Sequence, residues 1–197
     1  MMRLLDIFFA VIGLLVLFPL LILIFILGWL DTRSPLFRQE RVGRYQQPFI
    51  LVKFRTMRTD TVSVASHLVD ASAVTLLGGV LRRSKLDELP QLWNVLKGEM
   101  SLVGPRPCLF SQKELIQERS NRGIYAVRPG ITGLAQVQGI DMSSPKLLAA
   151  TDASMLQTLN LKNYFRYLFL TVTGNGAGDR VGAKQRDCME DSKHKSN

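Results

Sequence analysis

An uncharged run at residues 7–30 is the feature that most limits how this chain can fold. As a continuous helix, these 24 residues would be about 36 Å long, which is enough to cross the hydrocarbon core of a bilayer. No small-residue cleavage site precedes Asp31, so a cleaved signal peptide does not fit. The sequence therefore predicts a helix that remains in the membrane.

Pro19 lies in the middle of this run and leaves two topologies open. A proline removes one helical hydrogen bond and bends the helix, and each half is then too short to cross a bilayer alone. The segment either spans as a bent helix or enters one leaflet and returns. Arg3 precedes the run and Arg33 follows it, so two cytosolic ends would satisfy the positive-inside tendency.

The rest of the chain, about 165 residues, is long enough for one domain with its own core. A net charge of +9 indicates an anionic partner: nucleic acid, anionic lipid or a phosphorylated substrate. The two cysteines, Cys108 and Cys188, have no metal-type spacing and fit a reducing compartment. The two histidines are far apart, so no zinc site is expected.

Periodicity predicts an α/β domain that is mostly helical with a small sheet. Two alternating runs, around 36–42 and 49–57, predict a strand pair. Helices are expected at 73–83, from Asp87 to Gly98, from Ser111 to about Arg122, at 145–159 and in the aromatic stretch 164–172. Trp93 is expected on a buried helix face, and disorder is expected from residue 178 to the end.

The adjacent carboxylates of Asp87 and Glu88 admit two interpretations. An Asp at a helix start usually caps free N–H groups, and a Glu beside it is usually a solvated first-turn acid. Neighbouring carboxylates, however, also favour a divalent cation or a shared proton. The cations Arg82, Arg83 and Lys85 lie just upstream and could neutralise a diphosphate. This combination suits phosphoryl transfer.

Other cations are candidate phosphate ligands. Arg106 lies between Pro105 and Pro107, and Arg128 precedes a Pro-Gly turn, so both stand on stiff backbone that costs little entropy to fix. The simpler alternative is an arginine that binds a helix terminus. Lys53 and Arg55 share one strand face. The remaining basic residues at 33–58 are interpreted as a solvated face near lipid headgroups.

Several long motifs occur together in one order: KFRTM at 53–57, LRRSKLDELPQLWNVLKGEMSLVGPRP at 81–107 and VRPGITGLAQV at 127–137. With Arg3 and Asp6 ahead of the apolar run, they make the chain resemble the small monotopic phosphoglycosyl transferases among the bacterial sugar transferases. The resemblance extends from residue 3 to about residue 174. It implies transfer of a sugar-1-phosphate from a UDP-sugar to undecaprenyl phosphate, with release of UMP.

The resemblance also implies roles for individual residues. Asp87 would be the nucleophile, forming an aspartyl-phosphosugar, and Mg²⁺ would lie with Asp87 and the donor diphosphate. Glu88 would accept a proton or position a partner. Phosphate binding would fall to a basic set made up of Lys53, Arg82, Arg106 and Arg128. Pro19 would be the break of a re-entrant helix, which favours re-entry over spanning.

The expected organisation is a membrane helix at 1–32, a catalytic domain at 33–177 and a tail at 178–197, on the cytosolic face of the bacterial inner membrane. Phe18 replaces a Ser common before the proline, so the bend lacks a possible hydroxyl partner. Ile140 after Gly139, with Ser154 and Met155, departs from the family pattern in the part expected to touch the sugar and leaves the sugar open. A UDP-N-acetylhexosamine donor and a homodimer are the working expectations. Two rival hypotheses are a non-catalytic membrane scaffold for glycosyltransferases, and nucleic-acid binding, which rests on charge alone.

Overall fold

The computed structural model describes residues 2–61 and 71–173, so the predicted tail lies outside the described residues. Helices predominate and the strands form two small sheets, as the sequence predicts. The helices are α1 (Met2–Val16), α2 (Phe18–Thr32), α3 (Leu76–Ser84), α4 (Gln91–Lys97), α5 (Lys113–Asn121), α6 (Leu134–Val137), α7 (Pro145–Thr158) and α8 (Leu161–Val172). Short 3-10 turns are η1 (Arg44–Gln46), η3 (Ala71–Ala73), η4 (Leu86–Glu88) and η5 (Ile124–Ala126).

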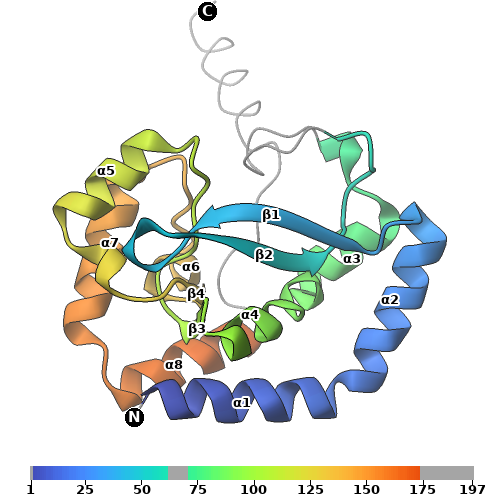
Figure 1. Ribbon diagram of the computed structural model, residues 1–197, viewed down its shortest axis with the longest axis horizontal. Coiled ribbons are helices and arrows are strands. Elements are labelled where there is room, and N and C mark those ends of the chain that lie inside the picture. Colours follow the sequence, from blue (N-terminus) through green and yellow to red (C-terminus); the bar gives the residue numbers. More distant parts are fainter. Residues whose placement is uncertain (1, 62–70, 174–197) are drawn as a thin grey trace, which may run out of the picture.

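Strands β1 (Leu36–Val42) and β2 (Pro48–Phe54) form the predicted antiparallel hairpin, with Leu36 opposite Phe54 and Val42 opposite Pro48. Figure 1 shows the hairpin crossing the centre of the molecule, with α1 and α2 along two of its sides. Strand alternation gives the hairpin two faces. The inner face carries Phe37, Gln39, Arg41, Phe49, Leu51 and Lys53; the outer face carries Leu36, Arg38, Glu40, Ile50, Val52 and Phe54.

The second sheet was not foreseen. Strands β3 (Ser101–Val103) and β4 (Gly130–Thr132) run parallel, and each has only three residues, too few to show periodicity in sequence. Gly104 and Gly130 allow the two segments to touch, because a Cβ on Gly130 would lie 2.1 Å from the backbone nitrogen of Gly104. The sheet brings the Pro-Arg-Pro turn next to the turn before β4.

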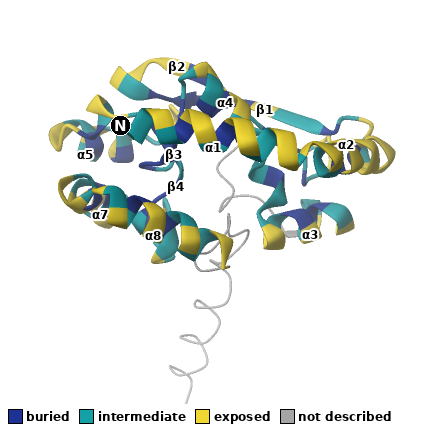
Figure 2. Ribbon diagram, turned by 90° about the horizontal axis from the view of Figure 1, so that it is seen from below, coloured by how far each residue is buried: buried dark blue, intermediate teal, exposed yellow. Residues whose placement is uncertain are grey.

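Helices α1 and α2 are two arms of one broken helix, bent by 64°. The break falls at Leu17, and Pro19 stands in the first turn of α2, where its missing N–H costs least. None of the described helices is by itself long and apolar enough to cross a membrane; the two arms meet that test only as a bent pair. Figure 2 colours many residues along both arms as exposed, and most of these residues are large and apolar.

The start of α1 is held firmly to the domain. The buried carboxylate of Asp6 accepts hydrogen bonds from the Ser101 hydroxyl, the Leu102 amide and the Tyr164 hydroxyl, at 2.8–3.0 Å. Arg3 donates to the carbonyl oxygens of Val95 (2.6 Å) and Met100 (3.1 Å) at the end of α4. One turn of α1 therefore joins α4, β3 and α8. Burial, together with Asp6, raises the pKa of Tyr164.

Four predicted helix starts differ from the structure by two to four residues. Helix α3 begins at Leu76, α5 at Lys113 and α8 at Leu161, whereas the predicted starts were residues 73, 111 and 164. Helix α4 begins at Gln91 with Pro90 at its N-cap, so Asp87 is not its cap.

Trp93 is also not where the periodicity put it. It is 58% exposed, and the buried face of α4 is formed by Gln91, Asn94 and Val95. Asn94 is buried because its side chain bonds to the edge of β2, donating to the Ile50 carbonyl (2.7 Å) and accepting from the Val52 amide (3.1 Å). An edge strand with unpaired backbone groups can be satisfied by a side-chain amide, and that need overrode the apolar pattern.

Candidate active site

Asp87 and Glu88, which we call the dyad, lie in the 3-10 turn η4, between α3 and α4. Lys85 ends α3 in a left-handed conformation (φ 58°), which reverses the chain and turns the next residues inward. Asp87 is consequently only 5% exposed. This carboxylate is buried and does not cap α4, so the capping interpretation does not describe its position. Phosphoryl-transfer chemistry therefore gains weight over capping.

Glu88 is paired with the arginine of the Pro-Arg-Pro turn. Arg106 Nη2 lies 2.7 Å from Glu88 Oε1, and both side chains are mostly buried. Such a charge-assisted bond in a partly desolvated setting fixes both groups more firmly than a surface pair would. The structure therefore brings Asp87, Glu88 and Arg106 together, as the motif predicts, although Arg106 is 18 residues further along the chain.

Lys85 adds a second cation beside Glu88 and Arg106. Burial lowers the pKa of the Lys85 ammonium, nearby Glu88 opposes that shift, and Arg106 adds to it. Lys85, Glu88 and Arg106 are thus electrostatically coupled. The charges of Lys85 and Arg106 offset those of Glu88 and Asp87, which lowers the repulsion that an anionic ligand would meet at Asp87.

The inner face of the hairpin supplies further cations. Lys53 is 8% exposed, its ammonium lies 5.7 Å from the Phe37 ring, and strand β2 packs against η4. Arg55 lies 5.4 Å from the same ring and donates to the Ser34 carbonyl (2.9 Å), so the two cations share a face as predicted. Arg82, in the last turn of α3, donates to the Thr56 hydroxyl at 2.9 Å.

Two buried arginines hold the Pro-Arg-Pro turn by successive carbonyl groups, and neither was predicted to do so. Arg119 Nη1 donates to the Arg106 carbonyl (2.8 Å), and Arg41 Nη1 donates to the Pro107 carbonyl (3.1 Å). Arg41 also bonds to Gln39 at 2.6 Å. The sequence placed Arg41 on a solvated basic face; in the structure it is 8% exposed. Strand alternation places Arg41 on the same face of the hairpin as Gln39 and Lys53, and the sequence could have indicated its burial in this way.

Arg119 is itself held by a buried ion pair. Its Nε and Nη2 donate to Asp152 Oδ2 at 3.0 and 2.6 Å, joining α5 to α7. Both side chains are about 2% exposed. Burial opposes the charge, but Asp152 holds the pKa of Arg119 above its ordinary value. No local pattern in the sequence links residues 119 and 152, because only tertiary packing brings α5 and α7 together.

The side chain of Arg128 binds the end of a helix. Its Nε donates to the Gly98 carbonyl (2.7 Å), which caps the C-terminal end of α4. The dyad precedes the N-terminal end of this seven-residue helix, about 10 Å away along its axis. The helix-terminus alternative therefore describes the side-chain contact of Arg128, while its backbone lies against Gly104 at the start of the Pro-Arg-Pro turn.

Among residues 2–61 and 71–173, no group of three or more His, Cys, Asp or Glu side chains could enclose a metal. Zinc-type sites need such a cage. Magnesium does not, because it commonly binds one or two carboxylates and completes its shell with water and substrate phosphates. Asp87 is a suitable single ligand of this kind, while Glu88 is engaged by Arg106.

Comparison with known proteins shows the family of the chain. The family model described as "Bacterial sugar transferase" matches residues 1–175, nearly all of the described chain. The chain belongs to the bacterial sugar transferase family. Membership makes the protein an enzyme and confirms the resemblance on which the dyad was first interpreted.

Curated relatives in this family carry related names. An exopolysaccharide production protein of Rhizobium leguminosarum is 42% identical over 149 residues, covering 70% of this chain and 74% of the relative. A UDP-glucose:undecaprenyl-phosphate glucose-1-phosphate transferase of Caulobacter vibrioides is 38% identical over 180 residues, covering 86% and 67%. A sugar transferase of Bacillus subtilis is 47% identical over 111 residues, covering 56% of this chain and about half of the relative (54%).

Proposed function

We propose that this sugar transferase moves a sugar-1-phosphate from a UDP-sugar to a polyprenyl phosphate, undecaprenyl phosphate in particular, releasing UMP. Relatives whose names describe this reaction support it. The observation that carries it is a buried aspartate that does not cap α4, next to a Glu88–Arg106 pair on a clamped turn. We expect the enzyme to start a bacterial surface glycan such as an exopolysaccharide, capsule or O-antigen.

The reaction has two displacements at one phosphorus atom. A carboxylate oxygen of Asp87 attacks the sugar-proximal phosphorus of the donor, the bond from that phosphorus to the bridging oxygen breaks, and UMP leaves with the electron pair. An oxygen of the polyprenyl phosphate then attacks the same phosphorus, the aspartyl P–O bond breaks, and Asp87 is a carboxylate again. A covalent intermediate of this type predicts ping-pong kinetics.

Other residues hold the charges in place. Arg106 is positioned for a phosphate of the donor, and Glu88 fixes the direction of its guanidinium through their 2.7 Å contact. Lys53, Arg82 and Lys85 add positive charge near η4. Mg²⁺, held by Asp87 and the donor diphosphate, would neutralise charge on the leaving UMP. We expect the transferred sugar to be an N-acetylhexosamine.

A UMP-release assay with a panel of UDP-sugars and polyprenyl phosphate tests this function. Wild-type protein should release UMP with at least one donor, and a radiolabelled sugar-phosphate should become bound to the protein when acceptor is withheld. Asp87→Asn should form no adduct and lose turnover. Near-normal turnover in Asp87→Asn would rule out the covalent step. Activity absent with every donor, despite folded protein, would favour the scaffold hypothesis.

We also propose that α1 and α2 form a re-entrant hairpin on the cytosolic leaflet of the inner membrane. Each arm has 15 residues, about 22 Å of helix, less than the hydrocarbon thickness. Both ends of the pair contact the same domain: Asp6 bonds to β3, and Gly28 packs against Pro35 just before β1. Apolar side chains cover the exposed surfaces of both arms, as lipid contact requires.

Single-cysteine labelling of each flank tests this topology, in a protein with Cys108 and Cys188 replaced by serine. Cysteines at Met2 and Arg33 should both react from the cytosolic side. Labelling from opposite sides would show a spanning helix. Pro19→Ala restores a backbone donor at the bend, so it should shift the flanks toward opposite sides, whereas Leu23→Ala should not.

A further inference from the structure

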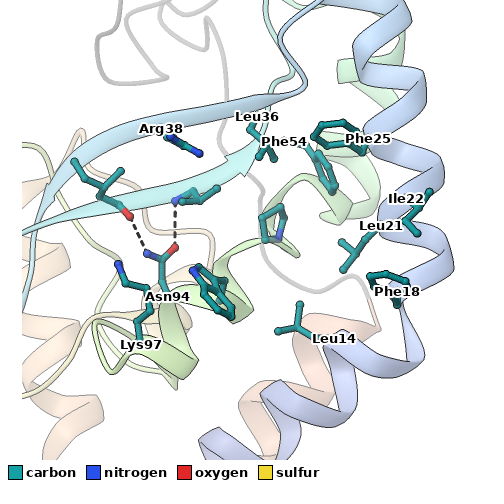
Figure 3. Close-up of a pocket in the computed structure, with 14 residues that line it drawn as sticks. Leu14, Phe18, Leu21, Ile22, Phe25, Leu36, Arg38, Phe54, Asn94 and Lys97 are labelled. Atoms are coloured by element: carbon teal, nitrogen blue, oxygen red, sulfur yellow. Dashed lines mark hydrogen bonds between the residues drawn. The ribbon is translucent and has the colours of Figure 1, made fainter.

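A large apolar cavity lies on the concave side of the broken helix, on the outer face of the hairpin. Its volume is about 800 Å³, within the range of small-molecule sites. Figure 3 shows its three walls, formed by the two arms, the hairpin and α4. The wall residues that matter below are Phe18, Ile22, Ile50, Phe54, Pro90 and Trp93. We call this space the inner-bend cleft.

The cleft is open and is not a gap in the packed core. Phe18, Ile22, Ile50 and Trp93 all line it, and each is between 44% and 59% exposed. Apolar side chains from three separate elements thus converge on one open space. A surface of this kind is costly in water and marks a site for an apolar ligand. The position of the cleft between the arms gives a chain lying in the membrane direct access to it.

Cations border the cleft. Arg38 lines it, is exposed, and has no hydrogen bond or ion pair with any residue in the described ranges 2–61 and 71–173. Lys97 also lines it, and its side chain is 47% exposed and paired with Glu99. Apolar walls with a free guanidinium at the edge are complementary to an amphiphile that has a long hydrocarbon chain and an anionic head.

The cleft adjoins the segment that follows the dyad turn. Pro90 lines it and is only two residues after Glu88, so the two backbones are less than about 7 Å apart. Leu86, the first residue of η4, packs against the cluster that contains Phe54. A chain seated against Phe54 and Pro90 therefore ends close to Asp87. An ordinary membrane phospholipid has no need of this proximity, whereas a lipid that takes part in the reaction does.

From these observations we propose that the inner-bend cleft seats the hydrocarbon chain of the polyprenyl phosphate acceptor, with Arg38 attracting its phosphate end. This inference rests on the proposed function and adds to it the place where the lipid substrate binds. It predicts that filling the cleft weakens acceptor use and leaves the donor half-reaction intact, because the cations assigned to the donor (Lys53, Arg82, Lys85 and Arg106) do not line the cleft.

Two neighbouring residues of α2 give a matched pair of variants. Ile22 lines the cleft and is 44% exposed; Leu23 does not line it and is 52% exposed. Ile22→Trp should raise KM for polyprenyl phosphate about tenfold, while Leu23→Trp leaves it unchanged. Arg38→Gln should raise the same KM severalfold, more so at low ionic strength, and Arg58→Gln should not. Acceptor-independent exchange of labelled UMP into the UDP-sugar should be normal in all four.

A photoreactive polyprenyl phosphate supplies a second readout. It should label cleft peptides of wild-type protein in nanodiscs, and unlabelled polyprenyl phosphate should compete while phosphatidylglycerol does not. Equal competition by phosphatidylglycerol, or an unchanged acceptor KM in Ile22→Trp, would overturn the inference, because the cleft would then hold bulk lipid. Failure of UMP exchange in the wild-type protein would instead contradict the proposed function, and the labelling result would still decide the cleft.

Discussion

At the scale of single residues, the charged side chains of the candidate site are mostly buried or paired and have little contact with water. Asp87 is buried in η4, and Glu88 and Arg106 hold each other at 2.7 Å. Polar groups taken out of water are costly unless they are paired, so the site is preorganised by its own ion pair before any ligand arrives. The sequence identified these residues by motif; it could not show that Glu88 binds Arg106.

Arg106→Lys should lower kcat/KM about tenfold or more. Lysine is a point charge that cannot reproduce the planar fork, so its contacts with Glu88 and a phosphate cannot both be kept. UMP release measured against donor concentration checks this. Arg58 pairs with Asp60 in solvent, at 67% and 69% side-chain exposure, and Arg58→Lys should have no effect. Equal rates for Arg106→Lys and wild type would remove Arg106 from the site.

Lys85 gives a pH prediction. Because the pKa of Lys85 is below its ordinary value of 10.5, its ammonium loses charge at a lower pH than a solvated lysine would. Donor KM should therefore rise with pH before 10.5 is reached. Lys85→Arg keeps its charge, so this rise should move to higher pH, whereas Lys113→Arg should not move it. If donor KM rises at the same pH in Lys85→Arg as in the wild type, Lys85 does not bind the donor.

The same shift has a consequence for stability. Folding lowers the pKa of Lys85, so the protonated form is the one that folding disfavours. Lys85 therefore weakens the folded state while it is charged, and that penalty is relieved as pH rises through the lowered pKa. Its burial is partial, so solvent screens much of the effect.

At the scale of elements, the site is assembled by contacts between segments that are distant in sequence. The Arg119–Asp152 pair joins α5 to α7, and Arg119 also holds the Pro-Arg-Pro turn by donating to the Arg106 carbonyl. Asn94 joins α4 to the edge of β2 in the same way. Arg119 and Asn94 are both buried and polar, and several hydrogen bonds position each of them.

Asp152→Asn should reduce stability and activity together. It leaves the Arg119 guanidinium buried without its counter-charge, which costs about 3–5 kcal/mol when a buried pair is broken. A thermal unfolding scan should show the loss, and UMP release should fall as the Arg106 carbonyl loosens. Glu114→Gln changes an exposed acid of α5 and should change neither. A normal melting temperature for Asp152→Asn would contradict the importance of this pair.

At the scale of the whole molecule, the broken helix and the catalytic domain behave as one folding unit. Asp6 accepts three hydrogen bonds from groups on β3 and α8, and Phe9 packs edge-on against Phe165 with ring centroids 5.9 Å apart. The first arm of the broken helix is therefore joined to β3 and α8 by buried hydrogen bonds and ring packing. The bend of the broken helix also forms one wall of the inner-bend cleft.

Asp6→Ala tests this coupling. It leaves the Leu102 amide and the Tyr164 hydroxyl without their acceptor in a buried position, at about 1–3 kcal/mol for each unsatisfied group. The melting temperature of the protein in detergent should drop by several degrees, and activity should fall with it. Asp31→Ala, at the exposed end of α2, should have little effect. Unchanged stability in Asp6→Ala would mean that α1 folds independently of the domain.

The sequence by itself determined the elements that depend on neighbouring residues. Alternation over 36–42 and 49–57 gave the hairpin, the uncharged run and Pro19 gave a broken helix, and the long motif gave the dyad and the family. Local periodicity and proline chemistry act over a few residues, so they can be interpreted without knowing the fold.

Tertiary structure alone decided the rest. It exposed Trp93 and buried Asn94, because the edge of β2 needed hydrogen-bond partners. It placed Arg106 against Glu88, recruited Arg41, Arg119 and Asp152 to hold that turn, and placed Arg128 at the far end of α4. Such pairings join residues tens of positions apart, and no periodic pattern encodes them. Burial and hydrogen-bond satisfaction select them only when the whole chain packs.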